Sequence, residues 1–105
     1  MPKLFAYGTL QDEKLQQKLF GKILKGKPAI LKGYHLGKIT IPRNETGSIY
    51  PAIRISENDT DKVFGYVYDI SDDEMEIATD YEGDDYNLVE ATLECGTKAK
   101  VFIVD

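Results

Sequence analysis

An acidic segment in the last third of the chain holds the residue best suited to acid/base chemistry. Residues 80–86 read DYEGDDY, so Glu82 stands directly before a glycine and is flanked by Tyr81 and Tyr86. Aromatic neighbours remove water from a carboxylate, and the two aspartates that follow the glycine repel its charge. Both effects raise the pKa of Glu82. Because a carboxyl group with a raised pKa exchanges protons near neutral pH, we predict that Glu82 is a proton carrier.

Two other interpretations of residues 80–86 stay open. The segment fits a solvated surface loop in which aspartates stabilise a turn. It also carries oxygen ligands of the kind that calcium binds, although only part of the spacing matches a calcium-binding loop.

A second candidate segment, Tyr7–Leu10 with the sequence YGTL, follows an apolar stretch. Residues 4–7 predict a short buried strand, Gly8 allows φ angles that other residues avoid, and the next residues predict a helix that ends near Gly21. Unpaired backbone N–H groups between a strand and a helix can hold a carboxylate or a developing oxyanion. The segment therefore predicts an anion-binding loop, with a plain turn as the alternative.

The sequence offers no nucleophile paired with a base. Cys95 and His35 are the one cysteine and the one histidine of the chain, and His35 lies in a predicted strand, where a structural role is favoured. A single cysteine cannot form an internal disulfide, and the two residues do not have the spacing of metal ligands. Chemistry at Glu82 should therefore need only proton transfer and anion binding.

The first half of the chain predicts several strands after the first helix. Residues 29–36 and 38–41 form two expected strands joined near Gly37, and residues 42–50 are rich in turn formers and predict a loop. Residues 50–55 predict a strand in which Pro51 must lie at an edge, because proline has no N–H for a ladder bond.

The second half predicts a strand at 63–70 with an aromatic face, then a helix that opens with the capping box Ser71 and Glu74. This helix should turn Met75, Ala78 and Ile77 inward and end at residue 80 or 81, before Gly83. Residues 86–94 and 98–103 predict a hairpin.

About six strands and two helices favour an α+β fold: a small, mixed, mostly antiparallel β-barrel with flanking helices. The 105 residues are expected to form one domain, 1–105.

The composition narrows the classes of molecule that the protein could bind. A net charge of −5 argues against nucleic acid, and the locally basic stretch from Lys14 to Lys27 is interpreted as a solvated surface, with RNA or an acidic partner as the alternative. No apolar run is long enough to cross a membrane and the start of the chain lacks a signal pattern, so we expect a cytoplasmic protein that does not bind membranes.

Four segments together resemble the gamma-glutamylcyclotransferase-like (AIG2-like) family. They are FAYGTL at 5–10, YPAI at 50–53, VFGYVYDI at 63–70 before a helix, and DYEGDDY at 80–86 before a final hairpin. The resemblance spans nearly the whole chain and implies a small mixed β-barrel with flanking helices.

The resemblance also implies an activity. Active members of the family close a γ-glutamyl group to 5-oxoproline and release an amine or amino acid, without a metal or cofactor. By that pattern Glu82 is the acid/base, and the residues that bind the γ-glutamyl compound are Tyr7, Gly8, Thr9, Leu10 and Tyr86. The chain departs from the pattern at Asn87 and Leu88, where many relatives carry arginines. A second hypothesis is therefore a binding or regulatory module that keeps the pocket without turnover.

Overall fold

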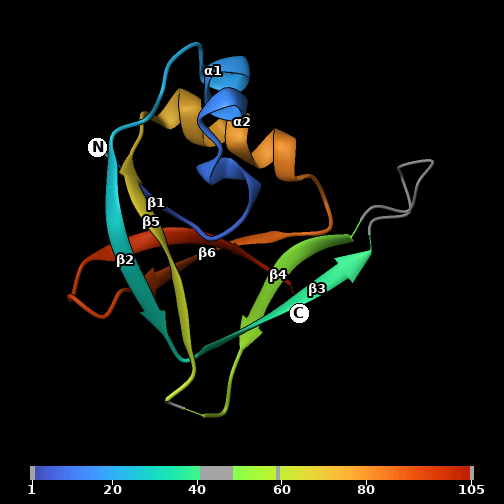
Figure 1. The fold of residues 1–105 in the computed structure, drawn as a ribbon, viewed down its shortest axis with the longest axis vertical. Helices are drawn as coiled ribbons and strands as arrows, with labels where there is room; N and C mark the ends of the chain where they lie inside the picture. The colour runs from blue at the N-terminus through green and yellow to red at the C-terminus, as the bar shows by residue number, and fades with distance from the viewer. Residues whose placement is uncertain (1, 41–48, 59, 105) are drawn as a thin grey trace.

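The structure, a computed structural model, describes residues 2–40, 49–58 and 60–104. Within these residues the backbone forms seven strands, two α-helices and one short 3₁₀ helix, labelled in Figure 1. In chain order they are β1 (Lys3–Ala6), η1 (Thr9–Gln11), α1 (Glu13–Phe20), β2 (Gly26–Lys32), β3 (Tyr34–Thr40), β4 (Ile49–Ile55), β5 (Lys62–Asp69), α2 (Asp72–Glu82), β6 (Asn87–Thr92) and β7 (Lys98–Ile103).

Five strands form one curved sheet in the order β2-β5-β1-β7-β6, and β3 pairs with β4 in a separate two-stranded sheet. The pairs are antiparallel except β1 with β7, which run parallel. The turn after β6 reaches the far edge of the sheet, where the Glu94 N–H donates to the Ile30 carbonyl at 2.8 Å. The α+β, mostly antiparallel fold is confirmed, although the sheet does not close into a barrel.

Alternation along the central strand separates two apolar layers. Phe5 of β1 faces one layer, which also holds Leu31, Ile53 and Val101. Leu4 and Ala6, on either side of Phe5 in the sequence, face the other layer. The second layer is covered by α1 and α2, which lie together on one side of the sheet (Figure 1). Because each fully buried large apolar side chain contributes about 1.5–3 kcal/mol, these layers hold β1, and with it the start of Tyr7–Leu10, in place.

The ends of both helices follow their sequence signals. Asp12 caps α1 by accepting from the Lys14 N–H at 3.0 Å. In α2 the capping box is confirmed, with the Glu74 N–H 3.1 Å from Ser71 Oγ and the Ser71 N–H 2.8 Å from Glu74 Oε1. Lys22 then joins the helices through an ion pair with Glu74 at 3.0 Å.

Two inward positions of α2 are confirmed and one is not. Ala78 is fully buried and Met75 packs against the second apolar layer, as predicted. Ile77, however, is 38% exposed, because it lies away from the face of the helix that meets the sheet.

The predicted break between the second and third strands is wrong. The chain turns at Gly33, which has φ +82°, so that β2 pairs with β5 and β3 pairs with β4 on either side of it. Gly37, the predicted break, lies inside β3 opposite Ala52. The predicted loop at 42–50 falls outside the described residues except at its end, where Ile49 and Tyr50 already belong to β4. Pro51 does lie on an edge strand, as expected.

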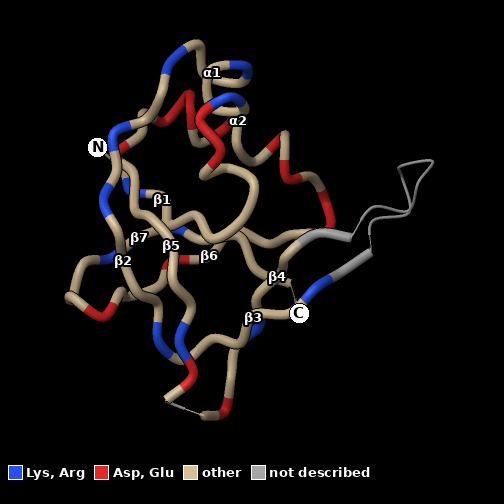
Figure 2. Tube along the Cα trace, viewed as in Figure 1, with Lys and Arg blue, Asp and Glu red and all other residues tan. Residues whose placement is uncertain are grey.

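Charge is divided between the elements. Figure 2 shows lysines along α1 and the start of β2, and acidic residues along α2 and the segment after it. In the described ranges, no helix combines the length and apolar character that crossing a membrane would need.

Candidate functional site

The end of α2 sets the position of the candidate acid, Glu82. Glu82 is the last residue of this helix, one residue beyond the predicted end, and Gly83 follows with φ +76°. Left-handed φ angles of this kind favour glycine, so the helix ends here. The chain then turns tightly, with the Tyr86 N–H 3.5 Å from the Gly83 carbonyl. Gly83 therefore fixes the position of Glu82 at the end of the helix and the position of Tyr86 after the turn.

Burial raises the pKa of Glu82 from 4.5 to about 7. The last turn of α2 acts in the same direction, since the negative end of a helix dipole disfavours a carboxylate. Asp84 and Asp85 are exposed and are not a cause of this rise, so the predicted repulsion by these two residues is not what raises it. The group can exchange a proton near neutral pH.

The segment Tyr7–Leu10 leaves β1 and forms a short turn. The Tyr7 hydroxyl donates to the Phe102 carbonyl of β7 at 2.6 Å, which anchors the start of the segment. The next residues form η1, and α1 begins only at Glu13, so the expected helix start at this segment is a 3₁₀ turn instead. In the described part of the chain, the N–H groups of Gly8, Thr9 and Leu10 donate no hydrogen bond.

Gly8 is favoured for a different reason from the one predicted. Its φ is −127°, outside the left-handed region. A Cβ at this position would lie 3.0 Å from Cγ of Pro51, tighter than most real contacts, so a side chain would push against β4. The glycine lets β4 approach the turn.

The structure brings the two predicted segments together. Thr9 Oγ1 lies 3.2 Å from the Tyr81 hydroxyl, which joins the turn to the last turn of α2. Burial is the main cause that raises the pKa of Tyr7, and the charges of Tyr86 and Glu82 raise it further, so these three side chains lie within electrostatic reach. Residues more than seventy positions apart in sequence therefore meet at one place.

Strand β4 forms a further wall of this site. The Tyr86 hydroxyl donates to the Pro51 carbonyl at 3.0 Å, and the Ile53 carbonyl accepts from the Val104 N–H at 2.9 Å. Because the hydroxyls of Tyr7 and Tyr86 both donate to backbone carbonyls, their protons are not available to the Glu82 carboxylate. This use of the hydroxyl protons is consistent with the high pKa of Glu82.

The remaining candidate residues lie elsewhere. His35 is exposed on β3 opposite Arg54, and Cys95 is exposed in the turn between β6 and β7, with Sγ 3.4 Å from Thr97 Oγ1. Across residues 2–40, 49–58 and 60–104, no three His, Cys, Asp or Glu side chains are placed to hold a metal ion, the acidic segment 80–86 included.

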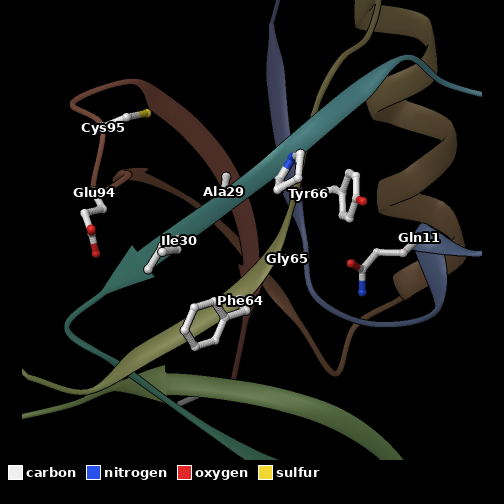
Figure 3. A pocket seen from close by; sticks show the side chains of 9 residues that line it. Gln11, Ala29, Ile30, Phe64, Gly65, Tyr66, Glu94 and Cys95 are labelled. Atoms are coloured by element: carbon white, nitrogen blue, oxygen red, sulfur yellow. The ribbon is translucent and has the colours of Figure 1, made fainter.

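A hollow of about 600 Å³ lies apart from Glu82, along β2 and β5. Figure 3 shows Gln11 at one end, Glu94 and Cys95 at the other, and the rings of Phe64 and Tyr66 between them. Glu94 forms an ion pair with Lys62 at 3.5 Å. The hollow therefore offers an apolar surface with a paired acid, and it lacks the half-buried carboxyl and the unpaired N–H groups of the site above.

One residue of the site was missed from the sequence. Gln16 of α1 is 1% exposed and donates from Nε2 to the Leu10 carbonyl at 2.8 Å. Its signal was present, because Gln16 lies on the helix face that carries Leu19 and Phe20 at spacings of three and four. A polar residue on an apolar face needs a buried partner.

The similarity to known proteins extends over all the residues of this site. The family model for gamma-glutamyl cyclotransferase, AIG2-like, matches residues 4–105. No curated protein matches the chain. Two Arabidopsis thaliana proteins with solution structures are similar over 98% of this chain, at 27% and 22% identity, each with a TM-score of 0.79. A protein named gamma-glutamyl cyclotransferase is similar in fold over 99% of this chain, at 15% identity and a TM-score of 0.77. The chain spans 61%, 68% and 66% of these three proteins.

Proposed function

Since the chain belongs to the gamma-glutamyl cyclotransferase, AIG2-like family, we propose that it is an enzyme that closes a γ-glutamyl group to 5-oxoproline. The substrate is a small γ-glutamyl compound, and the products are 5-oxoproline and a free amine or amino acid. Glu82 is the general acid/base. Tyr7 and Tyr86 line the substrate, and the amides of Gly8, Thr9 and Leu10 bind its negative charge.

The reaction needs one proton carrier and one anion site. Glu82 takes a proton from the α-ammonium group, and the freed nitrogen attacks the γ-carbonyl carbon of the same molecule. A new N–C bond closes the five-membered ring, and the amide C–N bond breaks when the leaving nitrogen receives the proton from Glu82. Because attack is intramolecular, the protein must mainly fold the substrate into the reactive shape. Backbone N–H groups can hold the α-carboxylate or the tetrahedral oxyanion, and each well-placed donor to an oxyanion contributes about 3–4 kcal/mol.

The observation that carries the proposal is the raised pKa of Glu82 beside a turn with open N–H groups. At a pKa of about 7, Glu82 is populated in both protonation states near neutral pH, so it can first accept a proton and then donate it. The contact between Thr9 and Tyr81 ties the acid-bearing helix to that turn. This combination supports proton transfer at a bound anion.

A substrate panel tests the proposal. The protein is incubated with γ-glutamyl amino acids and γ-glutamylamines, and 5-oxoproline is measured by mass spectrometry. We expect product from at least one compound and a loss of kcat/KM of about 100-fold or more in Glu82→Gln. Asp84→Asn, which removes an exposed neighbouring carboxylate, is the matched control and should keep its activity. No product from any compound, or full activity in Glu82→Gln, would overturn the proposal.

The alternative is a module that binds a γ-glutamyl compound without turnover. It is favoured by the departure at Asn87 and Leu88, because Leu88 packs into the apolar layer under the helices instead of offering a charge. Saturable binding of a γ-glutamyl compound in the absence of 5-oxoproline would select this alternative.

A further inference from the structure

Gln16 is a buried polar residue whose amide joins three segments. Its Nε2 donates to the Leu10 carbonyl at 2.8 Å, and its Oε1 accepts from the Leu24 N–H at 2.9 Å. The side chain therefore has partners at both ends of its amide while it is 1% exposed.

The carbonyls of the turn at 8–10 are all held in place. The Gly8 carbonyl accepts from the backbone N–H of Gln11 at 3.1 Å and from its side-chain Nε2 at 3.2 Å. The Thr9 carbonyl accepts from the Asp12 N–H at 2.9 Å. The third carbonyl, that of Leu10, is held by Gln16 from outside the turn.

Planar peptide bonds carry this restraint to the open amides. The Leu10 carbonyl and the Gln11 N–H belong to one peptide plane, so a bond to the first orients the second. The Gln11 N–H in turn holds the Gly8 carbonyl, which shares its plane with the Thr9 N–H. Gln16 thus acts on the Thr9 amide through two peptide planes and without contact with the substrate.

We propose that Gln16 is a positioning residue that sets the direction of the Thr9 amide in the anion-binding turn at 8–10. This inference rests on the proposed function for its effect on catalysis, but its effect on the turn can be measured without any activity. Without the Nε2 donor, the Leu10 peptide is free to rotate, the 3₁₀ turn loosens, and the Thr9 amide loses its fixed direction.

Two substitutions separate the donor from the packing of the side chain. Gln16→Met has a side chain of similar length but no donor for the Leu10 carbonyl. The carboxyl group of Gln16→Glu keeps an oxygen for the Leu24 N–H, and because burial raises its pKa it stays protonated near neutral pH and keeps one O–H donor. Gln17→Met makes the first change at an exposed neighbour in the same helix and is the matched control.

Hydrogen exchange tests the effect on the turn. We expect the amides of Gln11 and Asp12 to exchange at least about tenfold faster in Gln16→Met at pH 7.5, with the amide of Ala78 in α2 unchanged. Gln17→Met should match the wild type. Unchanged exchange at Gln11 and Asp12 would overturn the inference whether or not the protein is an enzyme.

Kinetics test the effect on catalysis. The kcat/KM of Gln16→Met should be about 10- to 100-fold below that of the wild type at pH 7.5. Gln16→Glu should recover most of this loss, because its protonated carboxyl supplies a donor to the Leu10 carbonyl. Wild-type activity in Gln16→Met, or an equal loss in Gln16→Glu, would contradict the positioning role.

The two proposals fail in distinguishable ways. A wild type that forms no 5-oxoproline removes the proposed function but leaves the exchange result to decide the role of Gln16. An active wild type with normal exchange in Gln16→Met removes only the role of Gln16. If Gln16→Met does not fold, Gln16→Asn takes its place in the exchange measurement. It keeps a neutral amide but is one methylene too short to reach both partners, so the same faster exchange at Gln11 and Asp12 is expected.

Discussion

Replacing Glu82 with glutamine should change how the stability of the protein depends on pH. Burial raises the pKa of Glu82 from 4.5 to about 7, so between these values the folded protein keeps a proton that the unfolded chain releases. A carboxyl of this kind contributes stability that is fully present below pH 4.5 and is lost as the pH rises through 7. Glutamine cannot ionise, so Glu82→Gln removes this dependence.

The magnitude follows from the size of the pKa change. A rise from 4.5 to about 7, at about 1.4 kcal/mol per pKa unit, corresponds to about 3 kcal/mol in total. About 2.5 kcal/mol of this total change falls between pH 5 and pH 8, an interval that avoids strongly acidic conditions. The wild type should therefore lose about 2.5 kcal/mol relative to Glu82→Gln over this interval.

Urea unfolding of both proteins at pH 5 and pH 8 measures this change. Any constant cost of placing an amide at position 82 cancels, because only the change with pH is compared. Asp84→Asn serves as the control, since it removes an exposed carboxylate from the same segment and should follow the wild type. A difference between wild type and Glu82→Gln that stays within about 0.5 kcal/mol at the two pH values would refute the burial argument.

Three further predictions concern the same site. The kcat/KM of the wild type should rise as the pH increases through about 7, because Glu82 must be ionised to accept the first proton; a profile flat from pH 5 to 8 would contradict this. Tyr81→Phe should lower kcat/KM several-fold by releasing Thr9, yet change the free energy of unfolding by less than about 1 kcal/mol. Tyr66→Phe should leave both quantities unchanged. Gly83→Ala and Gly21→Ala each force a residue with Cβ into a left-handed φ and should each cost about 1–2 kcal/mol in urea unfolding. Only Gly83→Ala should also reduce kcat/KM, because it lies beside Glu82, and equal losses of activity in both variants would argue against that placement.

Local signals predicted the ends of elements well. The Ser71 and Glu74 capping box lies within four residues, so its hydrogen bonds need no distant partner. The hairpin of β6 and β7 was also predictable, since both strands alternate and a five-residue turn joins them. These features are decided by neighbours in sequence.

Features decided by distant partners were harder to predict. Gly33 and Gly37 look alike in sequence, and only the pairing of β2 with β5 and of β3 with β4 selects Gly33 as the turn. The role of Gly8 depends on the approach of Pro51. Likewise, burial of Glu82 arises from the surrounding fold, whereas the exposed aspartates beside it in sequence do not raise its pKa.

The sequence offered candidate residues but not their arrangement. The roles of Glu82 as an acid and of the turn at 7–10 as an anion site stay predictions, and the contact between these segments through Tyr81 and Thr9 could not be read from a separation of 72 positions. The place of Gln16 on the apolar face of α1 indicates that it is buried, but its partners, the Leu10 carbonyl and the Leu24 N–H, are backbone groups that the sequence does not identify.

Binding of the product gives the most direct test of whether Glu82 and the turn serve one ligand. With labelled protein, 5-oxoproline is titrated while NMR follows the side-chain carboxyl carbon of Glu82 and the amides of Gly8, Thr9 and Leu10. We predict that all four signals shift with the same dissociation constant. Saturable shifts at the turn without any change at Glu82, or the reverse, would contradict the account.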